Sequence, residues 1–185
     1  YTALLHLSLM ELILPSIAYK SSYIEAVKEF QVPGASPIGE RHYAELVVTE
    51  LEADFDAYVE KVKSKSLGEN LPSGYVPMTE YWLVDAGEYL GRASVRHTLT
   101  DTLQKVGGHI GYDIRPSMRG RGYGNTILAL ALPKAKELGI TRVLLTCDAT
   151  NIASRKIIEK NGGVLENQVP NPETGVDKLR FWIDL

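Results

Sequence analysis

A glycine-rich turn that carries two arginines is the strongest chemical signal in this sequence. Residues Arg119–Gly124 read RGRGYG and lie between an apolar run at Gly111–Ile114 and a helix-like segment at Asn125–Leu138. Glycines allow a backbone to turn tightly and to approach a ligand closely, and the first amides of a helix have no partner inside the helix. Because the helix dipole also favours anions at that end, the turn predicts a site for a phosphate-bearing ligand.

The spacing of the glycines excludes two common phosphate-binding loops. A Walker loop has Lys and then Ser or Thr after its last glycine, whereas Asn125 follows Gly124 here. A dinucleotide-binding turn reads Gly-x-Gly-x-x-Gly, whereas Gly120, Gly122 and Gly124 give Gly-x-Gly-x-Gly. A nucleotide-binding domain stays open as an alternative, because Asp148 ends the next predicted strand.

The pattern Arg119-x-x-Gly122-x-Gly124 resembles the pyrophosphate loop of the GNAT superfamily of N-acetyltransferases. In that superfamily a later helix begins with Asn and carries a small residue three positions on, and Asn151 and Ser154 match in type and spacing. The resemblance spans residues 10–185. Further segments resemble a bacterial branch of predicted acetyltransferases: Leu71–Pro77, Tyr81–Asp85, Arg96–His97, Gly107–Ser117 and Leu144–Asp148.

The resemblance implies an α/β fold, in which a mixed β-sheet of six to seven strands is flanked by helices and its central parallel strands are splayed. It implies acetyl-coenzyme A as the cofactor, with the pyrophosphate held by the turn and the pantetheine arm between the strands that end at Ile114 and Cys147. It also implies acetyl transfer to a primary amine by direct attack. The cofactor-binding residues it indicates are Tyr112, Ile114, Arg119, Gly120, Arg121, Gly122, Tyr123, Gly124, Asn125, Thr126, Asn151 and Ser154.

An amine acceptor requires a proton acceptor. An alkyl amine has a pKa of about 10, so a base or a chain of water molecules must remove its proton at neutral pH. The candidate catalytic residues are His109, Asp113 and His97, with His109 first because it lies on the central strand, near where the superfamily often has its carboxylate base. Alternation along a strand directs His109 and Asp113 to one face and Tyr112 to the other. A structural role for His109, bonding a neighbouring strand or loop, is an equal alternative.

One position departs from the superfamily. Many relatives have a Tyr seven residues after the helix Asn to protonate the leaving thiolate, and Ile158 occupies that position here. A thiol has a pKa of about 8.5, so a dedicated acid is helpful but not obligatory. The departure keeps a second hypothesis open, a non-catalytic module that binds or senses acyl-coenzyme A. We assign Tyr123 and Cys147 no catalytic role, since packing explains both.

Length and composition favour one globular domain. The chain has 185 residues, a net charge of −3 and a single cysteine. We expect one domain over residues 10–185, with residues 1–9 an N-terminal extension or a remnant of cloning. The charge gives no reason to expect nucleic acid or membrane partners, and the lone cysteine suits the cytoplasm. No His, Cys or acidic cluster has the spacing of a metal site. The remaining partners are the acceptor, a small-molecule or peptide amine, and a second copy paired at the C-terminal sheet edge.

Local patterns predict the remaining elements. We expect a strand at Met10–Pro15, a helix capped by Ser21 or Ser22 and ending near Phe30, and a long helix at Arg41–Lys65. The pair Ala86-Gly87 predicts a hairpin turn. Further predicted elements are a central strand at His109–Arg115, helices at Gly122–Leu138 and Asn151–Asn161, a buried strand at Arg142–Cys147 and a closing antiparallel pair at Gly163–Val169 and Lys178–Leu185.

Overall fold

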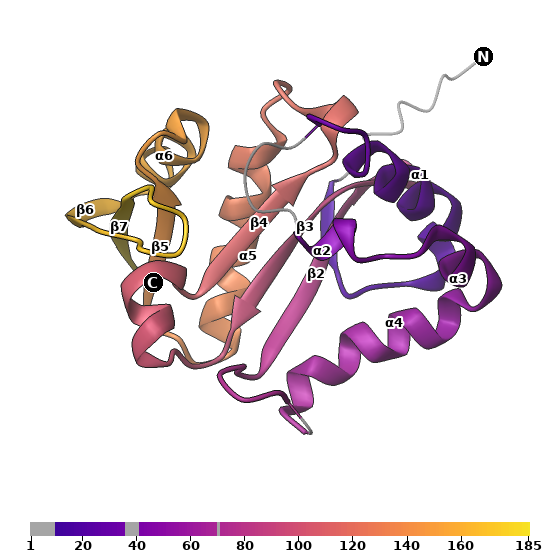
Figure 1. Ribbon diagram of the computed structural model, residues 1–185, viewed down its shortest axis with the longest axis horizontal. Helices are drawn as coiled ribbons and strands as arrows, with labels where there is room; N and C mark the ends of the chain where they lie inside the picture. Colours follow the sequence, from indigo (N-terminus) through magenta and orange to yellow (C-terminus); the bar gives the residue numbers. More distant parts are fainter. Residues whose placement is uncertain (1–9, 36–40, 70) are drawn as a thin grey trace, which may run out of the picture.

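Seven strands form two antiparallel sheets in the computed structural model, which describes residues 10–35, 41–69 and 71–185 (Figure 1). The first sheet has the order β1 (Glu11–Ile13), β2 (Met78–Asp85), β3 (Glu88–Arg96) and β4 (Ile110–Ile114). The second sheet has the order β5 (Arg142–Asp148), β7 (Lys178–Asp184) and β6 (Val164–Val169). The hairpin of β2 and β3 turns at Ala86 and Gly87, as the sequence predicts.

The two sheets meet where β4 lies beside β5. The amide of His109 donates to the carbonyl of Leu144 at 2.7 Å, and Gly108 forms a single antiparallel bridge with Leu145. Farther on, Tyr112 in β4 reaches Ser154 on α6 across the gap between the sheets. Beyond the bridge no ladder joins β4 to β5 in the described part of the chain, so these two central strands are splayed. The α/β fold class is confirmed.

Helices cover both faces of the first sheet (Figure 1). One face carries α1 (Lys20–Phe30), α2 (Arg41–Ala44), α3 (Val48–Ala53) and α4 (Phe55–Ser64). The other face carries α5 (Tyr123–Glu137), and α6 (Ile152–Lys160) packs against α5 and β5. Short helical turns complete the described structure: η1 (Ile17–Tyr19), η2 (Lys65–Leu67), the π-helix η3 (Leu103–Gly107) and η4 (Pro116–Met118).

Strand alternation divides the apolar interior into two cores. Leu83 and Val95 point toward Ile127 on α5, whereas Trp82 packs with Tyr23 and Phe55 from α1 and α4. The run Val143–Leu145 in β5 is buried throughout, as expected for a strand covered on both faces. Two layers of helices therefore cover opposite faces of the first sheet.

Two details of the helix prediction are wrong. The expected long helix at Arg41–Lys65 is three helices, because Val47 and Asp54 have non-helical backbone angles and the Asp54 side chain accepts the amide of Ala57 as a new N-cap. Neither Ser21 nor Ser22 caps α1, which begins directly after η1, and the Ser22 hydroxyl accepts the amide of Tyr89 instead. No helix among the described residues is both long and apolar enough to span a membrane.

Candidate active site

A cleft of about 540 Å³ opens where the end of β4, the glycine-rich turn and the start of α6 converge. It brings together most of the predicted cofactor-binding residues, namely Tyr112, Ile114, Arg119, Gly120, Tyr123, Gly124, Asn151 and Ser154. Asp113 lines it as well. Sequence reasoning missed the other lining residues, Met118, Thr150, Ile152, Ala153 and Ile157.

The glycine-rich turn presents unpaired backbone donors. Gly120 has φ 76° and Gly122 has φ 89°, a conformation that other residues adopt only with strain. The amides of residues 120–124 have no hydrogen-bond partner in the described structure. The first amides bonded within the helix are those of Asn125 and Thr126, which reach the carbonyl of Gly122. Consecutive free amides at a helix N-terminus form an anion-binding concavity.

Gly124 has a different reason to be glycine. A Cβ atom there would lie 2.6 Å from Cδ1 of Ile157 on α6. The missing side chain therefore lets the first turn of α5 approach α6 closely, which narrows the cleft between the two helix N-termini.

The two arginines of the turn have different surroundings. The Arg119 guanidinium donates to the carbonyls of Ile114 (3.1 Å) and Ala35 (2.6 Å) and lies over the ring of Phe30. Its side chain thus ties the turn to β4 and to the segment after α1, while its backbone lines the cleft. Arg121 is exposed beside the free amides.

Four predicted cofactor-binding residues do not line the cleft in this structure: Arg121, Gly122, Asn125 and Thr126. The Asn125 side-chain oxygen accepts from Nδ2 of Asn161 at 3.1 Å, so it joins the start of α5 to the end of α6. Asn151, which does line the cleft, also caps α6, because its side-chain oxygen accepts the amide of Ser154 at 3.0 Å.

Tyr112 crosses from β4 to α6. Its hydroxyl lies 2.9 Å from the Ser154 hydroxyl, and burial raises its pKa to about 12. Asp113, the next residue, belongs to the opposite face of the sheet, where its Oδ2 accepts from Nε of Arg92 at 2.8 Å. Tyr112 and Asp113 therefore point to opposite faces, as predicted, whereas His109 lies before the first residue of β4.

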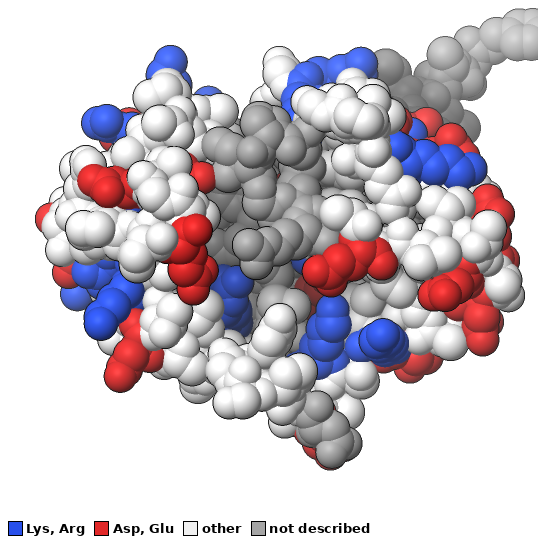
Figure 2. All heavy atoms as spheres, in the orientation of Figure 1, with Lys and Arg blue, Asp and Glu red and all other residues white. Residues whose placement is uncertain are grey.

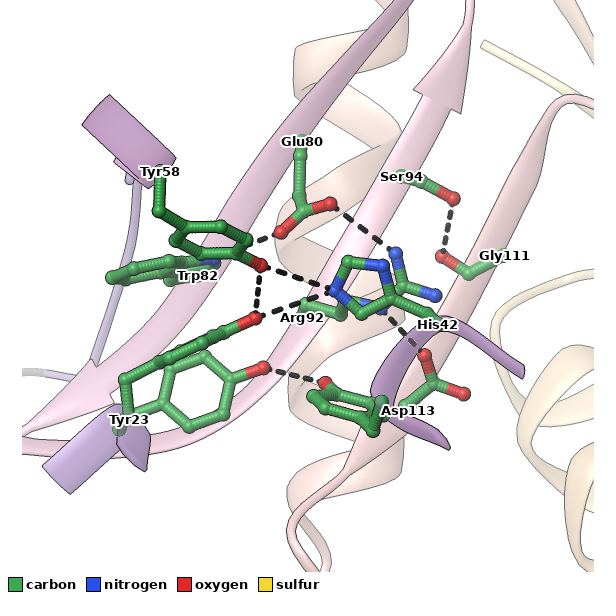
Figure 3. Close-up of polar contacts among 11 residues, drawn as sticks. Tyr23, His42, Tyr58, Glu80, Trp82, Arg92, Ser94, Gly111 and Asp113 are labelled. Atoms are coloured by element: carbon green, nitrogen blue, oxygen red, sulfur yellow. Dashed lines mark hydrogen bonds and ion pairs between the residues drawn. The ribbon is translucent and has the colours of Figure 1, made fainter. Parts of the chain in front are cut away.

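Asp113 ends a row of buried charges across three strands, which sequence reasoning missed (Figure 3). Nη1 of Arg92 on β3 donates to Oε2 of Glu80 on β2 at 3.2 Å, and the indole of Trp82 donates to Oε1 of the same carboxylate at 3.0 Å. Glu80 is fully buried; burial opposes its charge, but Arg92 and the Trp82 bond hold its pKa below the ordinary value. The sequence did carry a signal for this row, because Glu80 and Arg92 are charged residues inside two otherwise mainly apolar strands.

A neutral histidine and two phenols lie over this row (Figure 3). His42 Nε2 is 3.3 Å from the Tyr23 hydroxyl and 3.4 Å from that of Tyr58, and the two phenols also bond each other. Burial, and after it the charge of Arg92, lowers the pKa of His42 to about 3. His42 therefore adds no charge to the cluster at neutral pH.

The two histidine candidates lie away from the cleft. Nδ1 of His109 accepts the amide of Leu144 at 2.9 Å, and burial and Arg96 lower its pKa. This contact is the structural role that the sequence left open for His109. Nε2 of His97 lies 2.8 Å from the Thr79 hydroxyl. His97 follows the last residue of β3 and is five residues from Arg92, roughly 17 Å at strand spacing. Asp113 alone of the three catalytic candidates lines the cleft.

Three further positions limit the chemistry. Ile158 is buried in the core, so the superfamily's tyrosine position is apolar here. Burial raises the pKa of Cys147 to about 11, which keeps it a thiol. Asp148 is buried and paired with Lys178, so it is committed to β7 rather than presented to a nucleotide.

The surface charges are mixed. On the face shown in Figure 2, basic and acidic side chains are interspersed among the described residues. This pattern agrees with the small net charge of −3.

Several proteins of known structure share this fold. Among solved structures, RimL, a ribosomal L7/L12 alpha-N-protein acetyltransferase in complex with coenzyme A, aligns with a TM-score of 0.68 at 18% identity, covering 95% of this chain and 94% of its own. The microcin C7 self-immunity acetyltransferase MccE, with acetyl-CoA and AMP, has a TM-score of 0.67 at 15% identity, covering 95% and 92%. A spermidine N-acetyltransferase SpeG chimera from Vibrio cholerae and hSSAT has a TM-score of 0.61 at 16% identity, covering 95% of each chain.

These structural similarities show the fold alone, whereas the comparison with family models identifies the family. No curated protein matches the chain. The family model described as an acetyltransferase (GNAT) domain matches residues 41–164, more than half of the sequence, and its range includes the glycine-rich turn and the start of α6. The chain therefore belongs to the GNAT acetyltransferase family and is an acetyl-coenzyme A-dependent N-acetyltransferase, as its sequence predicts.

Proposed function

We propose that this protein moves the acetyl group of acetyl-coenzyme A to a primary amine by direct attack, without a covalent enzyme intermediate. The observation that carries the proposal is the row of free amides at residues 120–124, because three of these residues, Gly120, Tyr123 and Gly124, line the same cleft as the end of β4. The acceptor is a small molecule or a peptide. The related folds named above include a protein alpha-amine acetyltransferase and a spermidine acetyltransferase, so both classes belong in a screen.

The cleft suits an elongated cofactor. The free amides and the dipole of α5 would hold the pyrophosphate, with Arg121 able to add a charge-assisted bond. The pantetheine arm is peptide-like and can pair with an open strand edge. Beyond His109, β4 has such an edge, because no described strand pairs with it on the side of β5. This arrangement would bring the thioester to Tyr112–Ile114.

The reaction then needs one proton removed and one supplied. The acceptor ammonium loses a proton, the amine nitrogen attacks the thioester carbon, the carbon–sulfur bond breaks, and the coenzyme A thiolate takes up a proton. Asp113 is the candidate supported as the first proton acceptor, because it lines the cleft while His109 and His97 are bonded elsewhere. Water would protonate the thiolate, since Ile158 offers no acid.

Calorimetric titration with acetyl-coenzyme A, with NAD beside it, tests the cofactor site first. Saturable binding of acetyl-coenzyme A alone is expected. An amine screen with mass detection of acetylated product then tests the acceptor class, because a primary amine that serves as acceptor gains one acetyl group. Absence of acetyl-coenzyme A binding would refute the proposal.

A further inference from the structure

We propose that Glu80 and Arg92 are positioning residues that make Asp113 the docking carboxylate for an acceptor that arrives as an alkyl ammonium. The inference deepens the proposed function and rests on it, since the ammonium is the acceptor's amine before transfer. None of the three residues belongs to the glycine-rich turn, and Glu80 and Arg92 do not line the cleft.

Arg92 fixes one oxygen of Asp113 and leaves the other available. Nε of Arg92 holds Oδ2 at 2.8 Å, and Oδ1 points away from the guanidinium (Figure 3). No hydrogen bond or ion pair to Oδ1 exists among the described residues. Asp113 lines the cleft and its side chain is 19% exposed, so Oδ1 can accept an N–H from a ligand. A carboxylate held at one oxygen is pre-oriented, which reduces the entropy lost when a ligand binds.

Glu80 sets the charge that this carboxylate presents. Alone beside Asp113, the Arg92 guanidinium would neutralise the aspartate and repel an incoming cation. Glu80 binds the same guanidinium from β2, so two carboxylates share one cation and the trio keeps one negative charge. His42 is neutral above them. Two further cations are less closely placed. Lys65 of η2 lowers the pKa of Glu80 by its charge but forms no ion pair with it among the described residues. Arg96 lies four residues beyond Arg92 on the same face of β3, roughly 13 Å away at strand spacing, and donates to the carbonyl of Gly108.

The excess charge faces partly desolvated space. The side chains of Glu80 and Arg92 are 0% and 15% exposed, and the ring of Tyr43 covers Arg92 at 5.5 Å. Charges interact more strongly here than in bulk water, so the trio favours a ligand with one positive charge close to Oδ1. A neutral alcohol of the same length gains no such interaction.

Butylammonium is a probe that needs no knowledge of the natural acceptor. The amide signals of Asp113 and Ile114 would be followed by NMR as butylammonium is added to the full chain with coenzyme A present, with butan-1-ol as the neutral control. We expect saturable shifts with butylammonium only. Asp113→Asn should abolish them, and Glu80→Gln should weaken the affinity on the order of fivefold, because it leaves Arg92 to neutralise Asp113. Glu137→Gln, which removes the same charge from the exposed end of α5, should change nothing.

The outcomes separate this inference from the proposed function. If butylammonium does not bind, or binds the wild type and Glu80→Gln equally, the inference is wrong even where calorimetry finds acetyl-coenzyme A bound. If acetyl-coenzyme A does not bind, the proposed function fails first. Should Glu80→Gln not fold, Arg92→Lys tests the same claim, because lysine keeps the charge but cannot bond both carboxylates as the planar guanidinium does. Its cation affinity should fall several-fold, and an unchanged affinity would overturn the inference.

Discussion

Replacing Arg92 with methionine should destabilise the protein by roughly 3–5 kcal/mol at neutral pH, because it strands a buried carboxylate. Glu80 has no exposed side-chain surface and would keep only the indole bond of Trp82, while Asp113 would lose the donor on Oδ2. For a chain of this length the loss corresponds to a fall in Tm of roughly 6–20 °C. Urea unfolding followed by fluorescence measures it, since Trp82 is itself in contact with the carboxylate.

The stability lost in Arg92→Met should depend on pH. In the wild type the pKa of Glu80 is lowered, so the ion pair stabilises the fold above the unfolded carboxyl pKa of about 4.3 and is lost as pH falls through the lower folded value. Without Arg92, burial dominates and raises the pKa of Glu80. The folded variant then takes up a proton more readily than the unfolded chain, so its deficit should narrow as the pH falls from 7.5 toward 5.

Two controls make the result specific. The double variant Glu80→Gln with Arg92→Met should be more stable than Arg92→Met alone, because it no longer contains the fully buried, unpaired carboxylate of Glu80 and keeps only that of the partly exposed Asp113. Arg142→Met breaks an exposed pair with Asp184, whose side chains are 59% and 86% exposed, and should cost far less. A loss below about 1 kcal/mol for Arg92→Met, or a double variant that loses the sum of the two single changes, would refute this account of the cluster.

Three other changes test the site. His109→Gln should leave turnover and the pH–rate profile unchanged, because Nδ1 already accepts the Leu144 amide; loss of one limb of the profile would identify His109 as the base after all. Gly122→Ala should weaken acetyl-coenzyme A binding by up to about tenfold in calorimetry, because alanine at φ 89° costs about 1–2 kcal/mol. The control Gly139→Ala, at φ 84° beyond the other end of α5, should lower Tm without changing the affinity. Equal affinity in the two variants would show that cofactor binding does not depend on the shape of the turn. The His42 ring should not titrate between pH 5 and 8 in NMR, since burial lowers its pKa to about 3. Its neutral form should stabilise the fold above the unfolded pKa of about 6.5, and this contribution is lost as the pH falls. A titration midpoint near pH 6.5 would contradict the burial of the ring.

Elements with a local signal were predicted from the sequence, and elements without one were not. The hairpin at Ala86-Gly87, the helix that begins after Gly122 and the cap at Asn151 each depend on residues a few positions apart. The division of 41–65 into three helices was missed, because apolar residues from Leu51 to Val62 keep a helical period across the break at Asp54. Periodicity reports which face is buried, and it is insensitive to a break that preserves that face.

The sequence predicted the cofactor side of the candidate site but not the charged row on the other face of the sheet. The turn and the start of α6 are contiguous segments, so their chemistry could be read directly, and the cleft brings most of them together. The charged row needed the register of three strands. The hairpin pairs Trp82 with Arg92, but Arg92 meets Asp113 only through the pairing of β3 with β4, across an intervening segment that contains a π-helix. Length and composition do not determine that register.

The end of β4 explains why one cleft can serve two reactants. Tyr112 belongs to the face that packs toward α5 and α6, where the free amides lie, and Asp113 belongs to the face that packs toward α1 and α4, where the charged row lies. Adjacent residues of a strand cannot exchange faces without shifting the whole register. Changes at Tyr112 should therefore act on cofactor affinity and changes at Asp113 on the acceptor, and a variant at either position that altered both affinities equally would show that the two faces are not separate sites.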